Sequence, residues 1–496
     1  MNNAAVLFFE DGIEDSYYFH EKIYIPEYLN KLLKNSNKIH SIYFSLPSGY
    51  SGKITEMPKD SLFFRNSADD ISCWKNIFQK SKCVNIIKIY ADSYFLDINI
   101  INEMLALHLD YIAEYTFSEN LPAGYNCDIF SDKLISSIPD AGEQRLPLNK
   151  VVKTNINQFD VEIYYCEPDI RNKRTDFRMI TPRSRKVMEN ILAINKTIPE
   201  YKDILKIIND DPSILYVAPS YIEIELTGKY DSVPIYSHRK ASTFEHNNID
   251  IVLFKNIIDS ADKFGLPYSV CFGGLGDPLY HPNFYELLDY SLQSKLVENL
   301  VIETDGTLID DNFSSFINTK NDSRIKIIIS VNGFDKDSYK TIHNADDFDK
   351  VNSNIDKLLS TGNHASSIFV QIYKIKQTES FLDKYYDYWE AKKTGIILQK
   401  QNVYLGKVTD LRYSDLSPVL RIPCWHLERD MYILSNGQVA FCKQDFDGRF
   451  SNWNLSSSSM QIIWNERAIN YVNNCGESYP ESPDCAICDE WYTFNL

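Results

Sequence analysis

The stretch Tyr268–Pro282 has the sequence YSVCFGGLGDPLYHP, in which an apolar run ends in a turn that contains three glycines. Two further apolar runs follow, NLVIETDG at Asn299–Gly306 and IKIIISVNG at Ile325–Gly333. Short apolar runs bounded by turn residues are typical of buried strands in a parallel sheet. The intervals between the runs are long enough for one helix each, so the pattern predicts consecutive strand–helix units.

The same pattern continues on both sides of this stretch and extends over residues 213–405. The predicted strands are Tyr221–Leu226, Tyr268–Gly274, Asn299–Gly306, Ile325–Gly333, Ser367–Ile375 and Gly395–Tyr404. Six strand–helix units predict an open, partial (β/α)6 barrel, whose active face lies at the carboxyl ends of its strands.

Three other regions flank this barrel in a chain of 496 residues, a length that predicts roughly three domains. Residues 1–147 alternate apolar strands with amphipathic helices such as Ile25–Asn35, which indicates a further α/β domain. Residues 148–212 carry many charges of both signs and are interpreted as a bridging segment. Residues 406–496 are rich in cysteine and form the last predicted domain. The predicted fold class is therefore α/β multidomain.

The composition limits the function classes. The 51 basic and 68 acidic residues give a net charge of −17, which argues against a broad nucleic-acid or anionic-membrane surface. No apolar run approaches the roughly 18 residues of a membrane span. The apolar run Ala4–Phe9 is short and no basic segment precedes it, so it is not interpreted as a signal peptide. These features predict a cytoplasmic protein with reduced thiols.

Half of the ten cysteines lie in the last 73 residues: Cys424, Cys442, Cys475, Cys485 and Cys488. Cys485 and Cys488 form a CxxC pair on one tight turn, and a distant second pair can complete a four-thiolate site. Four thiolates suit either an iron–sulfur cluster or a structural zinc ion, and buried free cysteines are the alternative to both. Asn436-Gly437 predicts a hairpin turn that brings Cys424 and Cys442 together on paired strands.

The text CWHLERDMYILSNGQVAFC, followed by SNWNLSSSSMQIIWN and CAIC, resembles the SPASM domain of radical S-adenosylmethionine (radical SAM) enzymes. The resemblance implies one auxiliary 4Fe-4S cluster, held by four ligands: Cys424, Cys442, Cys485 and Cys488. Cys475 is a fifth thiol without an assigned role. We expect His426, beside Cys424, to hydrogen-bond near such a cluster rather than to bind it.

Radical SAM enzymes carry a CxxxCxxC motif after the first barrel strand, and this chain does not. Alignment on Thr227 places Tyr230, Pro234 and Ser237 at the three cysteine positions. Proline has no ligand atom, and tyrosine and serine are poor cluster ligands. The barrel is therefore predicted to be degenerate and not to generate a radical by the usual route.

Other parts of the radical SAM pattern are present. Gly273, Gly274 and Asp277 match the strand end that holds the cofactor's amino group, and Glu303–Gly306 (ETDG) resembles the third-strand motif. The resemblance also places cofactor contacts at Ser330 and Asn332, and an adenine contact at Tyr236. It thus makes S-adenosylmethionine a candidate cofactor; the alternative is that the glycines serve turns with positive φ.

Residues 1–147 resemble a GT-A-like nucleotidyltransferase of the spore-coat-polysaccharide cytidylyltransferase type. Ile89–Leu105 (IYADSYFLDINIINEML) matches the loop that carries metal and nucleotide, with Asp92 as the matching aspartate. The family's phosphate loop is replaced by Phe8–Lys22, which has one glycine and several carboxylates and would repel a triphosphate. The family's second acidic pair appears as Asn126 and Asp128.

The bridging segment concentrates arginines, namely Arg171, Arg174, Arg178, Arg183 and Arg185. An anion site or an acidic partner is one interpretation. The other is salt bridging to neighbouring domains, through four carboxylates: Glu162, Glu167, Asp169 and Asp176. The segment also predicts a helix with Thr181 as its N-cap and Pro182 in its first turn.

The order of these parts resembles the spiro-SPASM family. The leading hypothesis is a binding, scaffold or electron-transfer protein with one auxiliary cluster and a barrel that holds a nucleotide, the sulfonium cofactor or a peptide. The alternative is an enzyme that acts either as a nucleotide-sugar cytidylyltransferase or on S-adenosylmethionine without a radical. A redox protein is a further candidate partner, and a structural zinc site remains open.

Overall fold

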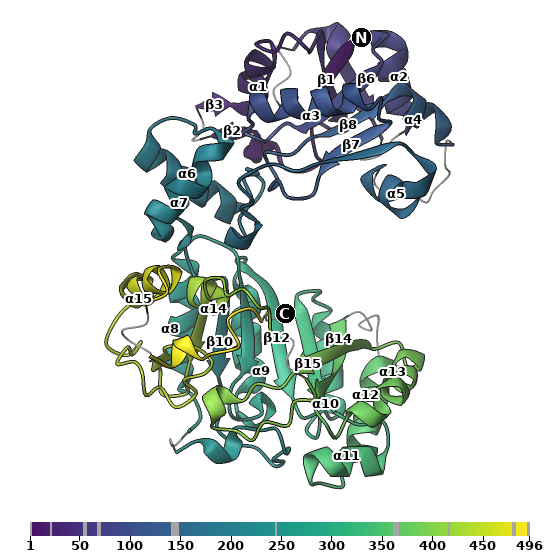
Figure 1. Cartoon of the computed structure of the whole chain (residues 1–496). Coiled ribbons are helices and arrows are strands. Elements are labelled where there is room, and N and C mark those ends of the chain that lie inside the picture. The colour runs from purple at the N-terminus through teal and green to yellow at the C-terminus, as the bar shows by residue number, and fades with distance from the viewer. Residues whose placement is uncertain are drawn as a thin grey trace. The chain divides into compact units, whose positions relative to one another are not determined.

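The computed structural model describes residues 2–19, 22–52, 57–66, 71–139, 148–243, 246–360, 367–414, 417–478 and 483–493. The chain forms two compact units, Met1–Val217 (unit 1) and Ala218–Leu496 (unit 2). Figure 1 draws unit 1 in purple to teal and unit 2 in teal to yellow. The boundary predicted at residue 147 falls in a stretch outside the described residues.

Unit 1 contains a seven-stranded sheet in the order β5-β4-β1-β6-β8-β7-β9. β5, β4, β1 and β6 are parallel, β8 is antiparallel to both its neighbours, and β9 is parallel to β7. The strands are β1 (Asn3–Phe8), β4 (Ser41–Pro47), β5 (Leu62–Arg65), β6 (Asn85–Tyr90), β7 (Tyr115–Ser118), β8 (Asp128–Ser131) and β9 (Val161–Tyr164). A short hairpin, β2 (Tyr18–Phe19) and β3 (Ile23–Tyr24), lies outside this sheet.

The helices of unit 1 are α1 (Ile25–Leu33), α2 (Ile71–Ser81), α3 (Ile98–Asp110), α4 (Asp132–Ser137), α5 (Leu148–Thr154), α6 (Pro182–Asn195) and α7 (Tyr201–Asp210). The predicted helix at Ile25–Asn35 is confirmed as α1, which buries Leu29 and Leu33. α6 starts at Pro182 as predicted, but Thr181 makes no side-chain cap. The Thr181 hydroxyl lies within hydrogen-bond distance of the Ser184 hydroxyl and the Asp176 carboxylate instead.

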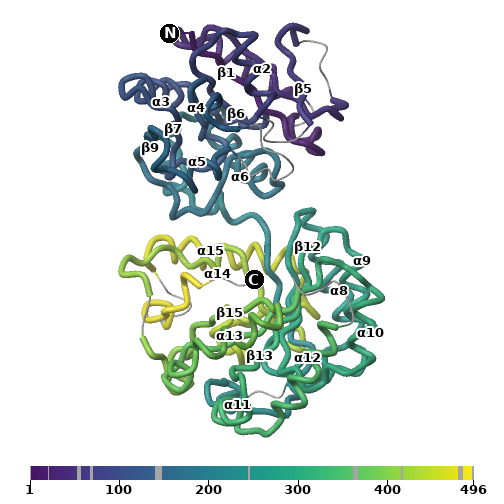
Figure 2. The backbone as a smooth tube through the Cα atoms, turned by 90° about the vertical axis from the view of Figure 1, so that its right-hand side faces the viewer, coloured from purple at the N-terminus to yellow at the C-terminus, as the bar shows by residue number. Residues whose placement is uncertain are grey.

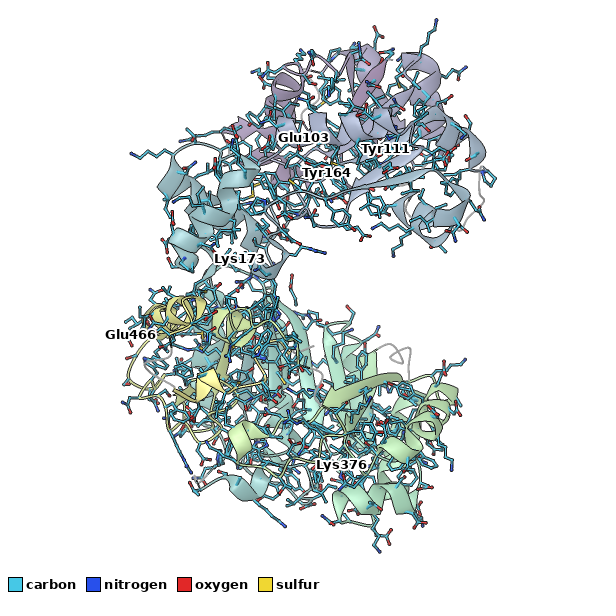
Figure 3. The ribbon with its side chains drawn as sticks, viewed as in Figure 1. Glu103, Tyr111, Tyr164, Lys173, Lys376 and Glu466 are labelled. Atoms are coloured by element: carbon cyan, nitrogen blue, oxygen red, sulfur yellow. The ribbon has the colours of Figure 1, made fainter. Side chains whose placement is uncertain are left out.

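β9 belongs to the charged segment 148–212 and forms an edge strand of the unit 1 sheet. All four of its residues are half-buried. The Tyr164 hydroxyl at its end donates to the carboxylate of Glu103 on α3, and Figure 3 labels both side chains. Because β9 lies half-exposed at an edge, its sequence VEIY lacks the continuous apolar run that marked the inner strands.

Unit 2 contains an eight-stranded sheet in the order β15-β14-β13-β12-β11-β10-β16-β17. β10 to β15 lie in chain order and are parallel, which confirms the predicted succession of six parallel strands. Their bounds are β10 (Tyr221–Glu225), β11 (Tyr268–Gly273), β12 (Val297–Thr304), β13 (Ile325–Ser330), β14 (Ile368–Lys374) and β15 (Gly395–Lys400). The chain is thus a mixed α/β protein with largely parallel sheets in both units.

Helices connect the successive strands of unit 2. They are α8 (Ile251–Asp262), α9 (Phe284–Gln293), α10 (Asp311–Lys320), α11 (Lys336–His343), α12 (Phe348–Ser360) and α13 (Leu382–Ala391). Figure 2 shows α8, α9 and α10 together along one side of the unit. None of the helices in the described part of the chain combines the length and apolar character needed to cross a bilayer.

The cysteine-rich C-terminal region continues the same sheet. It contains α14 (Trp425–Arg429), β16 (Asp430–Ile433), β17 (Val439–Ala440) and α15 (Met460–Cys475). β16 pairs in parallel with β10, and β17 pairs antiparallel with β16. The predicted hairpin turn is confirmed, because Gly437 has φ +82° and its amide donates to the carbonyl of Leu434 at 2.8 Å. The expectation that Cys424 lies on one of the paired strands is wrong, since Cys424 precedes α14.

Candidate functional site

A cavity of about 210 Å³ lies at the carboxyl ends of the unit 2 strands. Four of the six residues that the resemblance assigned to the cofactor line it: Gly273, Gly274, Ser330 and Tyr236; Asp277 and Asn332 do not. The four lining residues come from β11, the turn after it, β13 and the loop that follows β10. The carboxyl edge of a parallel sheet gathers strand-end side chains from distant parts of the chain, which explains why these residues meet here.

The turn after β11 requires glycine for steric reasons. Gly274 has φ +95°, which disfavours residues with a side chain. A Cβ atom at Gly276 would lie 2.1 Å from the backbone oxygen of Thr227. The close packing of this turn against the loop after β10 therefore accounts for the glycines without a ligand.

Asp277, one of the two residues that do not line the cavity, is buried. Its carboxylate accepts hydrogen bonds from the Thr304 hydroxyl at 2.7 Å and from the amides of Asp305 and Leu279 at 2.9 and 3.0 Å. Burial, reinforced by the charge of Asp305, raises the pKa of Asp277 to about 6. Asp277 thus links the end of β11 to the end of β12.

An arginine fixes the loop in which radical SAM enzymes carry their cluster cysteines. Arg239 forms a buried ion pair with Asp305 at 2.7 Å, and it also donates to the carbonyls of Leu275 and Ser232. Its guanidinium carbon lies 4.9 Å from the centre of the Tyr230 ring. Pro234 and Ser237, at the other two cysteine positions, line the cavity. The loop is therefore held to the strand ends by a permanent positive charge.

Tyr236, the residue matched to the adenine contact, stacks on Tyr373 with ring centres 4.0 Å apart. Asn332 organises this pair: its amide donates to the Tyr236 hydroxyl at 2.8 Å, and its oxygen accepts from the Tyr373 amide at 2.8 Å. Asn332 is fully buried and has φ +52°. In this structure one face of the Tyr236 ring is covered by another side chain of the same unit.

An ion pair between a partly exposed lysine and a buried glutamate forms part of the cavity wall. The Lys443 ammonium lies 2.8 Å from the Glu223 carboxylate. Burial raises the pKa of Glu223 and the attraction of Lys443 lowers it, with a net rise. For Lys443, burial acts to lower the pKa, but attraction to Glu223 and Glu303 outweighs it and the pKa is raised. Lys443 follows the predicted cluster ligand Cys442, so this ion pair connects the C-terminal region to β10.

The four predicted metal ligands influence one another electrostatically. Cys442 follows β17, and Cys485 lies in a 3-10 turn at Pro483–Ala486. Burial raises the pKa of the Cys442 thiol, and the charges of Cys488, Cys485 and Cys424 raise it further. The pKa of Cys424 rises through burial and the charges of Cys488 and Cys485. Burial likewise raises the pKa of Cys488 to about 11.

These thiols do not form a preorganised site for a single ion. Within the described ranges, no group of three or more His, Cys, Asp or Glu side chains is arranged to hold a metal ion. His426, beside Cys424, uses both ring nitrogens internally: Nδ1 faces Asp430 and Nε2 lies 2.9 Å from the Thr493 hydroxyl. This agrees with the expectation that His426 hydrogen-bonds rather than binds metal.

At the strand ends of unit 1, the aspartate predicted to lie in the nucleotide loop forms an ion pair with an arginine of the same unit. Asp92 is fully buried, and its carboxylate accepts from Arg178 Nε at 2.6 Å and from the Ile180 amide at 3.1 Å. Arg178 also pairs with Glu10, which follows β1. Burial raises the pKa of Asp92, and the positive charge of Arg178 opposes that rise.

The salt bridges expected of the bridging segment are therefore correct only in part. Arg171 pairs with one of the expected carboxylates, Asp169, which lies within the segment itself. Arg178 instead pairs with Asp92 and Glu10, which lie 86 and 168 positions away in the chain. The loop that ends in Gly124 packs closely on this segment, because a Cβ atom there would lie 2.3 Å from the Phe177 oxygen.

No protein family model matches the chain. By sequence, it is 25% identical over 364 residues to an uncharacterized protein of Treponema pallidum, covering 70% of this chain and 97% of that protein. It is 23% identical over 141 residues to the GTP 3',8-cyclase of Chlorobaculum tepidum, covering 28% of this chain and 41% of the enzyme. The second match supports, for part of the chain, the relationship with radical SAM proteins that the motifs predicted.

Two solved structures align with part of the chain. SuiB of Streptococcus suis bound to S-adenosylmethionine aligns at 14% identity with a TM-score of 0.42, covering 55% of this chain and 73% of SuiB. A cytidylyltransferase from Leptospira borgpetersenii aligns at 18% identity with a TM-score of 0.36, covering 43% of this chain and 96% of that protein.

Proposed function

We propose that the chain is an iron–sulfur protein of the spiro-SPASM type. One auxiliary 4Fe-4S cluster is held by four cysteines: Cys424, Cys442, Cys485 and Cys488. The barrel, at residues 213–405, does not perform radical chemistry and acts as a ligand-binding or scaffold domain beside this cluster. The C-terminal region, 406–496, serves as the SPASM domain, and residues 1–147 are a cytidylyltransferase-like domain without transferase activity.

The mutual influence of the four thiols is the observation that carries this proposal. Cys442 lies within electrostatic range of the other three, although they are up to 46 positions away in the sequence. Thiols with raised pKa values are protonated at neutral pH, so binding of a metal centre would release protons. When bound, a cluster of this type supplies one-electron transfer.

An iron–sulfur cluster and a zinc ion place four thiolates differently. A single zinc draws all four thiolates onto one atom at about 2.3 Å. In a four-iron cluster each thiolate binds a different iron, so the sulfur atoms lie further apart. The resemblance of the C-terminal sequence to the SPASM domain supports the cluster over zinc, and metal analysis distinguishes the two.

The loop after β10 does not fit a radical cluster, and the cavity does not fit S-adenosylmethionine. Pro234 provides no ligand atom there, and Arg239 brings a buried positive charge. The cavity of about 210 Å³ is below the roughly 300–1,000 Å³ that pockets for larger ligands occupy. Tyr236 is already stacked on Tyr373. The proposal therefore includes no step through this cofactor.

Unit 1 supports the same conclusion for nucleotidyl transfer. An aspartate that binds a metal ion must present a free carboxylate oxygen to it. In Asp92, one oxygen accepts from Arg178 and the other from the backbone of Ile180. We therefore expect no release of pyrophosphate from CTP by this chain.

Anaerobic purification with metal analysis tests the proposal. We expect about four irons and four sulfides per chain and brown protein. The variants Cys424→Ser and Cys442→Ser should lose the iron. Cys475→Ser is the matched control, because Cys475 ends α15 and is outside the predicted ligand set, so it should keep its iron. Folded, colourless protein with one zinc ion, or with no metal, would contradict the proposal.

A further inference from the structure

The carboxylates that line the unit 2 cavity differ in their partners. Most are neutralised or hydrogen-bonded: Glu223 by Lys443, Asp305 by Arg239, Glu490 by Lys400, Glu225 by His246, and Asp445 by backbone amides. Among the described residues, Glu303 is the exception, with no hydrogen-bond or ion-pair partner. It lies at the end of β12 and lines the cavity.

Glu303 shares its surroundings with a second carboxylate. A Cβ atom built on Gly273 would lie 3.2 Å from a Glu303 oxygen and 3.3 Å from a Glu223 oxygen, so the two carboxylates flank the same glycine. Lys443 is bonded to Glu223 and attracted to Glu303. This group of two carboxylates and one ammonium carries a net charge of −1, which favours a further positive charge in the cavity.

Gln444 provides an independent sign of a missing ligand. Its side chain lines the cavity and is only 6% exposed. Its amide oxygen is buried and has no hydrogen-bond partner among the described residues. A buried acceptor without a donor is costly, so such atoms in native proteins usually face a water or a ligand.

The rest of the lining suits an organic cation. Six aromatic side chains line the cavity: Tyr221, Tyr236, Tyr373, Tyr404, Tyr432 and Phe446. Aromatic faces attract ammonium groups, and this attraction strengthens where water is excluded. The carboxylate and the amide oxygen provide hydrogen-bond acceptors, and the aromatic rings provide faces that attract a cation. Together they suit a positively charged ligand that donates hydrogen bonds.

We propose that this cavity binds a small primary amine, whose ammonium group donates hydrogen bonds to the Glu303 carboxylate and the Gln444 amide oxygen. This inference rests on the proposed role of the barrel as a binding domain and names the ligand class. The volume of about 210 Å³ equals the share of about seven waters in liquid water. The ligand is therefore a compact amine, with its carbon chain against the tyrosine rings.

Calorimetry on the full-length, anaerobically purified protein tests the inference with a matched series of four-carbon ligands. The series is a diamine, an amino alcohol and a diol of the same chain length. Because one net negative charge is to be balanced, the diamine and the amino alcohol should bind, and the diol should bind at least about tenfold more weakly. Equal binding of the diol, or no binding of either amine, would overturn the proposal.

Two variants locate the site. Glu303→Gln keeps the shape and removes the charge, and should weaken amine binding by about tenfold or more. Glu298→Gln is the matched control, because Glu298 lies on the same strand but is exposed, and its affinity should equal that of the parent. Gln444→Leu should weaken the amines as well. Amine binding unchanged in Glu303→Gln would sink the assignment.

Iron content separates this inference from the proposed function. Glu303→Gln should retain the iron of the parent, so that its loss of amine binding reflects the cavity alone. An iron-free parent that still binds amines through Glu303 would contradict the cluster and leave the amine site standing. An iron-loaded parent that does not bind the amines would support the cluster and contradict the amine site.

Discussion

Both parallel sheets end in an aspartate that is paired with a buried arginine, and the comparison of these two edges is instructive. In unit 1 the pair is Asp92 and Arg178; in unit 2 it is Asp305 and Arg239. Each aspartate follows its strand, and each arginine comes from a separate loop. In both units an internal cation occupies the edge where related folds bind a charged ligand.

The two edges differ in what remains open. In unit 1, Arg178 also pairs with Glu10, and the backbone of Ile180 takes the remaining oxygen of Asp92. In unit 2, Arg239 fixes the loop after β10, while Glu303 stays available to a ligand in the cavity. The difference teaches that one motif residue, Asp305, can hold the fold while Glu303, two positions earlier on β12, faces the ligand site.

Loss of the unit 1 arginine should have the largest effect. Arg178→Met leaves Asp92 buried without a counter-charge, which costs about 3–5 kcal/mol of unfolding free energy. Hydrogen exchange at increasing urea, followed by mass spectrometry of the peptides of unit 1, measures this unit separately, whereas the five tryptophans of unit 2 would mask the fluorescence of Trp74. The double variant Arg178→Met with Asp92→Asn should recover most of the loss. If the single variant were as stable as the parent, Arg178 would not be needed to neutralise Asp92 at the sheet edge of unit 1, contrary to our interpretation.

The second prediction concerns the stability of unit 1 at low pH, where a smaller effect is expected. Burial lowers the pKa of His108 in unit 1 to about 4, from an ordinary 6.5. His108 is therefore neutral in the folded state and becomes protonated in the unfolded state first. Stability should fall as the pH drops from 6.5 towards 4, by up to about 3 kcal/mol. His108→Gln should flatten this slope when the exchange of unit 1 peptides is measured at several pH values; an unchanged slope would assign it to other groups.

The smallest effect on stability is expected for Asp277, which links the end of β11 to the end of β12 in unit 2. Asp277→Asn keeps one acceptor oxygen but replaces the other with an amide nitrogen. That nitrogen faces groups that now donate hydrogen bonds to Asp277, so the variant should lose about 1 kcal/mol of unfolding free energy at neutral pH. Since the folded pKa of Asp277 is raised to about 6, ionisation weakens the parent as the pH rises through that value, and the variant lacks this dependence. Urea unfolding at two pH values measures both. If Asp277→Asn lost as much unfolding free energy as Arg178→Met, Asp277 rather than the ion pair of Arg239 and Asp305 would be the main stabilising group at the sheet edge of unit 2.

The inner strands could be predicted from sequence because Ile, Val and Phe fill them continuously, as in Ile325–Ser330. The edge strand β9 was missed because its residues are half-buried and charged. The turn at Asn436-Gly437 was predictable from two residues, since positive φ is a local property. The position of Cys424 before α14 depends on how that helix packs, which no local pattern encodes.

The candidate site shows the same division between local and distant causes. Gly273, Gly274, Tyr236 and Ser330 could be placed at one edge because parallel strands end together. The partners of Arg178 and Arg239 could not, because the aspartates lie 86 and 66 positions away. Glu303 belonged to a motif that was noticed, yet its lack of a partner depends on where Lys443 lies, 140 positions later.

The parallel pairing of β10 with β16 has a consequence for biosynthesis. β10 is buried along its whole length, but its neighbour on that side is made about 200 residues later. At about 5–20 residues per second, translation leaves this strand edge without its partner for roughly 10–40 s. Nascent chains that stop before Asp430 thus present an open apolar edge, and such a ribosome-bound intermediate is a natural client for a chaperone.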